Sequence, residues 1–222
     1  MFQTYVNGIR WDEVENDLET GETITLWQQF GEIVKKLHST SGESFGHPQP
    51  SYQYEIWSEA VLQRCEKLHH SLIEYQIESS DFGEITRIAQ EKASYLDAIQ
   101  TPRLLHGDLW TFNLLIDRNL KVPKIVGVID IDRAWWGDPM ADWSMFLLEI
   151  RREKQEWQSR IKAFEDGYGV IETGVEQTFR KEIYKSMHIA DAAVWGVRNE
   201  DMKAKSRAKA ELAIILEKIQ GL

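Results

Sequence analysis

Short runs of branched apolar residues interrupt an otherwise helical pattern near the middle of this chain, and this break constrains the fold more than any other feature. The runs lie at residues 103–105, 114–116 and 125–131, and turn-forming residues separate them. Residues 119–123 would join the second run to the third as a hairpin. We therefore expect an α+β fold that is mainly α, with one small β insertion at about residues 103–131.

The rest of the chain shows apolar residues at helical spacing. This spacing predicts helices over about residues 23–39, 54–76, 81–99 and 201–219, with Ser80–Asp81 as the N-cap of the third. Residues 2–7 favour a strand that Gly8 ends, and the Gly, Pro and Ser content of residues 41–51 indicates a loop. The last helix carries an apolar stripe that we interpret as core, namely Ala204, Ala208, Leu212, Ile215, Leu216 and Ile219.

The composition is ordinary for a globular protein and excludes several classes of function. The 222 residues suffice for one large domain or two small ones, and no run approaches the roughly 18 consecutive apolar residues of a membrane helix. The start has no secretion signal, and the single cysteine, Cys65, excludes an internal disulfide; both indicate the reducing cytoplasm. The net charge of −10 argues against a nucleic-acid partner. It is compatible with a cationic small molecule, although most acidic proteins are simply soluble ones.

Three polar side chains stand at the ends of the short runs. Asp108 and Asn113 lie between the first run and the second, and Asp130 lies near the end of the third. Adjacent strands are about 4.8 Å apart, so a hairpin brings such ends together. Asn113 and Asp130 would converge on one hard cation, with Asp108 close by. This suits Mg²⁺, because the ion takes oxygen ligands and usually leaves room for phosphate oxygens.

Phosphoryl transfer needs such a set of groups. Metal ions neutralise the phosphate oxygens, and a carboxylate orients the attacking hydroxyl and accepts its proton. The other interpretation is that Asp108 and Asn113 are loop residues whose side chains bind backbone amides. Asp130 does not fit that interpretation easily, because an unpaired acid that ends an apolar run would be costly.

Two motifs in this region resemble one known family. HGDLWTFN, residues 106–113, fits the H-x-D-x-x-x-x-N catalytic loop of the aminoglycoside phosphotransferase and choline kinase family, whose members have a protein-kinase-like fold. GVIDIDRAWWGDPMADWS, residues 127–144, is similar to that family's hydrophobic Ile-Asp segment, followed by Gly-Asp-Pro and a further Asp. The protein-kinase counterpart of Asp130 is the metal-binding Asp of Asp-Phe-Gly. The Leu-Trp pair after Asp108 also resembles the fructosamine kinase branch.

The resemblance implies a role for each residue that matches the two motifs. Asp108 would be the catalytic base. Asn113 and Asp130 would hold Mg²⁺ and, with it, the phosphates of ATP. Leu115 and Ile129 would form the apolar floor under the adenine. The acceptor of the phosphoryl group would be a hydroxyl of a small molecule.

Other matching residues would support the site. His106 and Asp142 would brace the catalytic loop by hydrogen bonds, although Asp142 also suits a simple helix N-cap. We take Trp110, Asp132 and Trp135 as candidates for the substrate cleft, although large aromatic side chains such as Trp110, Trp135 and Trp136 more often belong to a core. The role of Asp138 in Gly-Asp-Pro is less defined.

Three further features favour structural roles. Cys65 has no identifiable base and is expected to fill the core. His69 and His70 lack metal-ligand spacing and suit a helix surface. The glycine cluster at residues 167–174 follows the catalytic motifs and is expected to connect two helices rather than to cover phosphates.

The resemblance implies the C-terminal lobe of a protein-kinase-like phosphotransferase, with residues 1–12 as a hinge-like segment and residues 13–222 as the lobe. We expect no counterpart of the family's N-terminal lobe, which supplies a phosphate-covering loop and a lysine paired with a helix glutamate. Three hypotheses follow: a fragment of a working kinase, a chain whose lobe comes from another polypeptide or a dimer partner, and a non-catalytic binding module or pseudokinase remnant. On this basis the chain alone should bind nucleotide weakly and turn over slowly.

The motifs leave the acceptor open. Similar motifs serve aminoglycosides, choline, homoserine, sugars and protein-bound fructosamines. Glu149, Glu153 and Asp166 would suit a cationic acceptor, but such residues more often form a solvated face.

Overall fold

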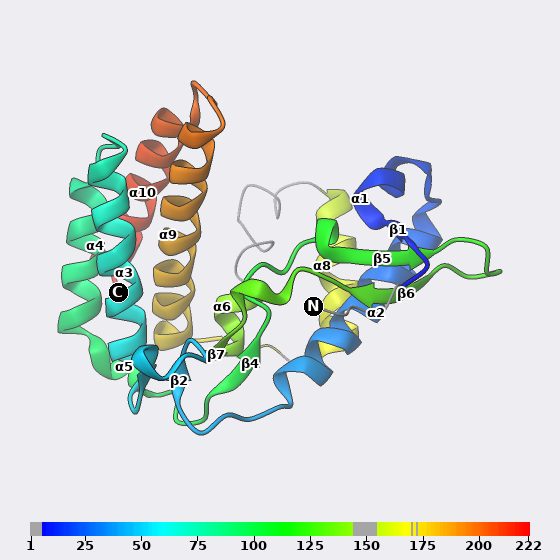
Figure 1. Ribbon diagram of the computed structural model, residues 1–222, viewed down its shortest axis with the longest axis horizontal. Helices are drawn as coiled ribbons and strands as arrows, with labels where there is room; N and C mark the ends of the chain where they lie inside the picture. Colours follow the sequence, from blue (N-terminus) through cyan, green and yellow to red (C-terminus); the bar gives the residue numbers. More distant parts are fainter. Residues whose placement is uncertain (1–5, 144–154, 170, 172) are drawn as a thin grey trace.

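Two small antiparallel sheets stand next to the helices in the computed structural model, which describes residues 6–143, 155–169, 171 and 173–222 (Figure 1). The first sheet has the order β1 (Ile9–Arg10), β5 (Leu114–Asp117), β6 (Lys124–Val128). The second has the order β3 (Gln53–Tyr54), β2 (Phe45–Gly46), β7 (Trp135–Gly137), β4 (Arg103–Leu105).

The helices form two groups. One group lies beside the first sheet: α1 (Trp11–Val14), α2 (Thr20–His38) and α8 (Gln155–Tyr168). The other is a bundle: α3 (Trp57–Glu74), α4 (Ser80–Glu91), α9 (Val175–Arg198) and α10 (Ala204–Gln220), with the short α5 (Ala93–Asp97) and α6 (Pro139–Trp143) at its end. The mainly helical α+β fold class is thus confirmed. Among the described residues, no helix is both long and apolar enough to cross a membrane.

The expectation of one β insertion is wrong. β4 pairs with β7 rather than with β5, through the partners Arg103–Gly137 and Leu105–Trp135. The expected loop over residues 41–51 contains β2, which pairs with β3 and β7. Strands of two or three residues carry too short a pattern to recognise, and their pairing depends on residues far away in the sequence.

Strand and helix ends also differ from expectation. The run at residues 125–131 is a strand only to Val128, because Asp130 has a left-handed φ of 64°, which no strand accommodates. The N-terminal strand begins at Ile9, after Gly8; of the expected strand, residues 2–5 lie outside the described residues. The helix expected over residues 81–99 is divided into α4 and α5, and the N-cap of α4 is Ser79.

Two glycines allow α2 and α8 to pack closely. A Cβ on Gly31 would lie 2.1 Å from the carbonyl oxygen of Phe164, and a Cβ on Gly167 would lie 2.1 Å from that of Gln28. The ring of Phe30 meets that of Phe164 at 5.4 Å. Because each glycine faces backbone of the other helix, no side-chain rearrangement makes room for a larger residue.

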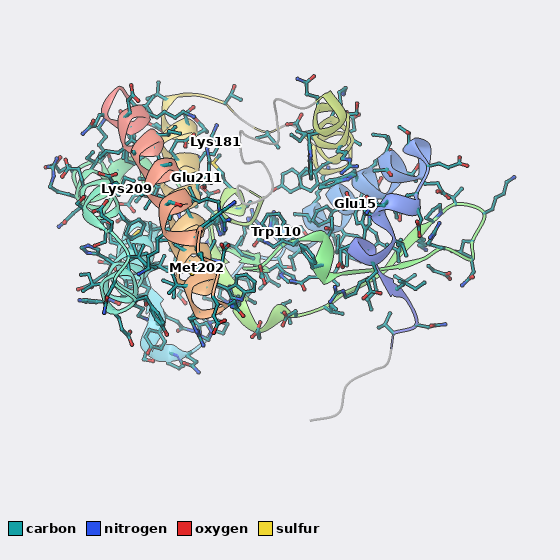
Figure 2. All side chains as sticks on the ribbon, turned by 90° about the horizontal axis from the view of Figure 1, so that it is seen from above. Glu15, Trp110, Lys181, Met202, Lys209 and Glu211 are labelled. Carbon is teal, nitrogen blue, oxygen red and sulfur yellow. The ribbon has the colours of Figure 1, made fainter. Side chains whose placement is uncertain are left out.

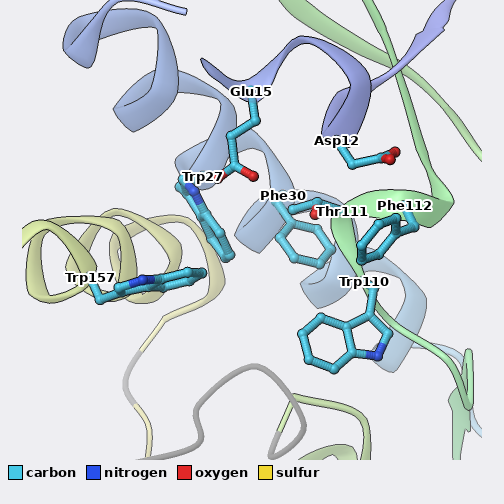
Figure 3. Close-up of a pocket in the computed structure, with 8 residues that line it drawn as sticks. All are labelled: Asp12, Glu15, Trp27, Phe30, Trp110, Thr111, Phe112 and Trp157. Atoms are coloured by element: carbon cyan, nitrogen blue, oxygen red, sulfur yellow. The ribbon is translucent and has the colours of Figure 1, made fainter. Parts of the chain in front are cut away.

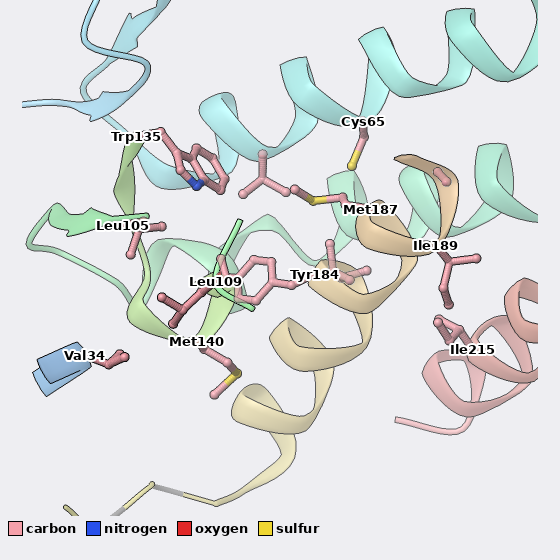
Figure 4. Close-up of a cluster of buried hydrophobic side chains, with 14 of the residues drawn as sticks. Val34, Cys65, Leu105, Leu109, Trp135, Met140, Tyr184, Met187, Ile189 and Ile215 are labelled. Carbon is pink, nitrogen blue, oxygen red and sulfur yellow. The ribbon is translucent and has the colours of Figure 1, made fainter. Parts of the chain in front are cut away.

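The hydrophobic core extends from β4 and the segment after it into the helical bundle (Figure 4). Leu105 and Leu109 belong to one buried cluster with Tyr184 and Met187 of α9 and with Cys65 of α3. The stripe predicted for the last helix is buried as well, with Leu216 partly buried at its edge.

A buried polar network joins α3, α6 and α9. The carboxylate of Asp138 accepts hydrogen bonds from Arg180 Nε at 3.0 Å and from the hydroxyl of Tyr184 at 2.9 Å. Trp57 Nε1 donates to the same hydroxyl at 2.6 Å. Asp138 is therefore a residue of the bundle's interior.

We predict that Gly31→Ala destabilises the protein by about 1–3 kcal/mol, because the added methyl group overpacks the contact between α2 and α8. Gly21→Ala, in the first turn of the same helix, is the matched control. Nothing lies within 4 Å of a Cβ at Gly21, so the higher helix propensity of alanine should leave stability unchanged or raise it by up to about 1 kcal/mol. Urea unfolding measures both free energies, and equal effects of the two substitutions would contradict the packing argument.

Candidate active site

The 106–113 loop leaves β4, passes η4 (Ile131–Arg133) and enters β5 through η3 (Thr111–Asn113). Gly107 has a φ of 82°, and a Cβ on it would lie 2.1 Å from the carbonyl oxygen of Arg133. Only glycine combines this backbone conformation with so close an approach. The loop is therefore pressed against the segment that follows Asp130.

Asp142 anchors the start of the loop. Its carboxylate is buried and accepts hydrogen bonds from the backbone amide of His106 at 2.7 Å and from that of Gly107 at 2.8 Å. His38, at the end of α2, lies 3.1 Å from the same carboxylate through Nε2. Asp142 belongs to α6, so the loop and two helices meet at one side chain.

The imidazole of His106 is fully buried and joins the loop to the end of β6. Its Nδ1 accepts from the backbone amide of Asp108 at 3.3 Å, and its Nε2 lies 2.9 Å from the carbonyl oxygen of Ile129. An acceptor at Nδ1 and a donor at Nε2 describe one neutral tautomer. In this arrangement, His106 has no nitrogen left for a substrate.

Asn113 forms a second connection between the same two segments. Its side-chain Nδ2 donates to the backbone carbonyl oxygen of Asp108 at 2.8 Å. Its backbone carbonyl oxygen accepts from the backbone amide of Ile129 at 2.9 Å. The side chain is buried, and the amide nitrogen is used by the backbone. The side-chain oxygen Oδ1 is therefore the atom of this amide that can contact a ligand.

Asp108 is half-buried, and its surroundings act on the pKa of its carboxyl group in both directions. Burial raises the pKa of its carboxyl group, and the nearby charge of Asp130 raises it as well. The positive charge of Arg133 acts in the opposite direction. The net effect is a raised pKa, which makes the ionised carboxylate a stronger base.

Asp130 is exposed and follows β6 in the left-handed conformation. It makes no hydrogen bond or ion pair with any residue that the structure describes. The expectation that this acid would be costly to leave unpaired is therefore wrong, because its carboxylate faces solvent. Its influence on the pKa of Asp108 shows that the two carboxylates lie within electrostatic reach of each other.

The donors at this site fit a hard cation. No group of three His, Cys, Asp or Glu residues in the described part of the chain is arranged for a metal. An amide oxygen from Asn113 and a carboxylate from Asp130 are nevertheless oxygen ligands of the kind that Mg²⁺ takes, usually together with water and substrate phosphates. Two protein ligands are enough for such a site.

Leu115 and Ile129 lie at the first sheet. Leu115 is half-buried and pairs with Arg10 of β1 and Gly127 of β6. A Cβ on Gly127 would approach the side chains of Val6 and Leu115, so these residues share one face of the sheet. Ile129 is half-buried, and its backbone joins Asn113 to His106.

A cleft of about 670 Å³ opens beside Asp108, between the 106–113 loop with Arg133 on one side and α9 and α10 on the other. Trp110 from the loop and Glu211 from α10 both line it (Figure 2). We refer to this space as the main cleft.

A smaller cavity of about 200 Å³ lies on the other side of Trp110 (Figure 3). Trp27, Phe30 and Trp157 contribute rings to it. The two carboxylates at its wall already have cationic partners, since Asp12 pairs with Arg10 and Glu15 pairs with Arg160, each at 2.7 Å.

Two residues predicted for the substrate cleft lie elsewhere. Trp135 is 7% exposed and packs in the core against Trp57, with ring centroids 4.9 Å apart, because burying a large ring is favourable. Asp132 is exposed and does not line the main cleft, whereas its neighbour Arg133 does. Successive residues of a 3₁₀ turn point in directions about 120° apart, which separates the two side chains.

The structural roles expected elsewhere are confirmed. Cys65 is buried, and burial raises the pKa of its thiol to about 12. His70 is exposed on α3, and His69 is only partly covered. Residues 169–174 connect α8 to α9.

Sequence reasoning missed the far wall of the main cleft. Asp191 and Trp195 of α9 and Arg207 and Glu211 of α10 line it. Trp195 is 62% exposed. The spacing of four residues within each pair places its members on one helix face, but no local pattern shows that these faces lie opposite Asp108.

Comparison with solved structures shows that the chain has the fold of aminoglycoside phosphotransferases. A thermostable variant of aminoglycoside phosphotransferase APH(4)-Ia, in its apo form, superposes with a TM-score of 0.69 at 18% identity, covering 98% of this chain and 72% of that one. The GDP complex of aminoglycoside 2'-phosphotransferase-IIIa gives a TM-score of 0.61 at 17% identity, with 96% and 69% coverage. No curated protein sequence matches the chain.

The family is shown by a match at the level of sequence. The sequence model described as "Phosphotransferase enzyme family" (APH) matches residues 1–180. This range contains both motifs, the residues whose hydrogen bonds hold the 106–113 loop, and the first part of α9. The chain belongs to the phosphotransferase enzyme family.

Proposed function

We propose that this chain transfers the γ-phosphoryl group of ATP, in the presence of Mg²⁺, to a hydroxyl of a small molecule. The observation that carries the proposal is the set of hydrogen bonds by which Asn113 and His106 hold Asp108 next to the end of β6, where Asp130 follows. Family membership supports phosphoryl transfer as the reaction class. A structural neighbour of similar fold was solved as a ternary complex with AMP-PNP and hygromycin B.

In the proposed reaction, the acceptor oxygen attacks the γ-phosphorus while the bond from phosphorus to the bridging oxygen of ADP breaks. The electron pair of that bond leaves with ADP. Asp108 accepts the proton of the hydroxyl, and its raised pKa favours this step. A half-buried position beside the main cleft gives the carboxylate access to an acceptor there.

Asn113, through Oδ1, and Asp130, through its carboxylate, would hold Mg²⁺, which neutralises charge on the phosphate oxygens when bound. Asp130 has no protein cation to displace among the described residues. Leu115 and Ile129 would form the floor under the adenine, with residues 1–12 as the hinge-like segment and residues 13–222 as the lobe. His106 and Asp142 would keep the loop in place.

The alternative, a binding module without activity, predicts a different role for Asp108. A module needs no base, so substitution of Asp108 would then affect ligand binding alone or nothing at all. The first prediction below separates these two functions.

Asp108→Asn should lower kcat by roughly 10²–10⁴-fold, because the variant cannot accept a proton, and should leave ATP affinity nearly unchanged. Steady-state kinetics and calorimetric titration with AMP-PNP measure the two quantities. Asp132→Asn is the control for removing a nearby exposed acid. Parallel loss of kcat and nucleotide affinity would indicate that Asp108 is structural.

The same substitution should stabilise the metal-free protein at neutral pH. A carboxyl whose pKa is raised in the folded state stabilises the fold only in its protonated form, and this contribution is lost as pH rises through the folded-state pKa. We therefore expect Asp108→Asn to raise Tm at about pH 7.5 in EDTA, and the gain to vanish towards pH 4, near the unfolded-state pKa of about 3.9. A lower Tm at pH 7.5 would contradict the burial of this charge.

Asp130→Asn and Asn113→Ala should both increase the Mg²⁺ concentration needed for half-maximal activity, because the first replaces a charged carboxylate ligand with a neutral amide and the second removes an amide oxygen ligand. Asparagine tolerates the left-handed conformation of residue 130, so the first variant keeps the backbone. Activity measured over a Mg²⁺ titration, with Asp132→Asn as control, tests this. An unchanged Mg²⁺ dependence in both variants would remove them as ligands.

A further inference from the structure

Both arginines among the described residues of the main cleft are paired with a carboxylate. Arg133 pairs with Asp191 at 3.0 Å across the cleft wall, which joins η4 to α9. Arg207 pairs with Asp201. Burial lowers the pKa of His188, which is therefore neutral at physiological pH.

Two carboxylates remain. Among the cleft residues that the structure describes, Asp108 and Glu211 are acids without an ion pair. Asp108 is needed to accept the proton from the acceptor. Glu211 is thus the one described carboxylate of the cleft that is available for a cationic group.

Among the described residues, the lining of the cleft therefore holds only a small part of the net charge of −10. Asp166, one of the acids considered for a cationic acceptor, pairs with Lys162 at 2.7 Å on the surface of α8. Glu149 and Glu153 lie outside the described residues.

Apolar surface makes up much of the remaining wall. Trp195 is 62% exposed and Phe112 is 52% exposed, and both line the cleft together with Trp110. Ala192 and Ala193 of α9, with short apolar side chains, line it as well. Exposed rings beside a concave site provide faces on which a ring of a ligand can stack.

Resting on the proposed phosphotransferase function, we propose that the acceptor is a hydroxyl compound with an apolar, ring-containing body and at most one positive charge, rather than a polycation. The apolar body lies against Trp195 and the rings of the 106–113 loop, which directs the hydroxyl to Asp108. A polycation would find only one unpaired carboxylate besides Asp108 among the described residues of the cleft, and its other ammonium groups would lie near Arg133 and Arg207. Unpaired charges in such a site reduce affinity.

Three probes test the proposal with the 222-residue chain. 1,4-Benzenedimethanol is neutral, 4-(aminomethyl)benzyl alcohol carries one positive charge, and hygromycin B carries several amino groups. Ligand-observed NMR titrations in the presence of Mg²⁺ and AMP-PNP give the dissociation constants. We expect both aromatic alcohols to bind, with hygromycin B at least about tenfold weaker; tighter binding of hygromycin B than of both alcohols overturns the proposal.

Matched variants locate the binding site. Trp195→Ala should weaken binding of both aromatic alcohols by roughly tenfold, because it removes the ring on α9. Met202→Ala removes an apolar side chain that is 93% exposed and lies outside the cleft, so it should have no effect. Equal effects of the two substitutions would overturn the placement of the apolar body.

A charge added to the cleft provides an independent measurement. Ala192 is exposed and lines the cleft, so Ala192→Glu adds a carboxylate without breaking an existing pair. Relative to Ala192→Gln, which has nearly the same shape without the charge, affinity for the monocation and for hygromycin B should be roughly 3- to 10-fold higher, and affinity for the neutral alcohol should be equal. An unchanged affinity for both cations would show that they do not bind in this cleft and would overturn the proposal.

Phosphoryl transfer to the same probes, followed by mass spectrometry, separates this inference from the proposed function. Faster phosphorylation of hygromycin B than of the aromatic alcohols, abolished by Asp108→Asn, overturns the acceptor class and leaves the function intact. Binding of the alcohols that depends on Trp195, without any transfer, supports the ligand class and contradicts the function.

Discussion

The carboxylate of Asp142 is the interaction on which the rest of the site depends. It receives the amides of His106 and Gly107 and lies next to His38, so the start of the loop is held by α6 and by the end of α2. Hydrogen bonds to a charged group contribute about 1.5–3 kcal/mol each. Without this acceptor, two amides at the base of the loop would lose their partner, and Asp108 would lose its fixed position.

The packing of the helices determines where Asp142 lies. Gly31 and Gly167 bring α2 and α8 into close contact, and the hydroxyl of Tyr168 in α8 lies 3.0 Å from Nδ1 of His38 at the end of α2. Asp138 joins α6 to α9 and α3 through Tyr184 and Trp57. The main cleft therefore lies between two bodies that are each tightly packed, and its walls come from segments that are far apart in the sequence.

Local charge at the site follows from this arrangement. Asp108 is half-buried because Leu109 inserts into the core directly after it. Arg133 is close enough to lower the pKa of Asp108 and is at the same time held by Asp191 of α9. The electrostatic environment of one loop residue is thus shared between the loop, η4 and the helical bundle.

The sequence by itself determined the elements that depend on local patterns. The apolar stripe of α10, the helix α2, the hairpin of β5 and β6, and the grouping of Asp108, Asn113 and Asp130 follow from spacing and from two motifs. Only the tertiary structure decided that β4 pairs with β7, that Trp135 enters the core, that Asp130 faces solvent, and that Trp195 and Glu211 face the loop. The reason is physical: periodicity reports which face of a segment is buried, whereas pairing of two-residue strands and the opposition of distant helix faces depend on contacts that form only when the whole chain is packed.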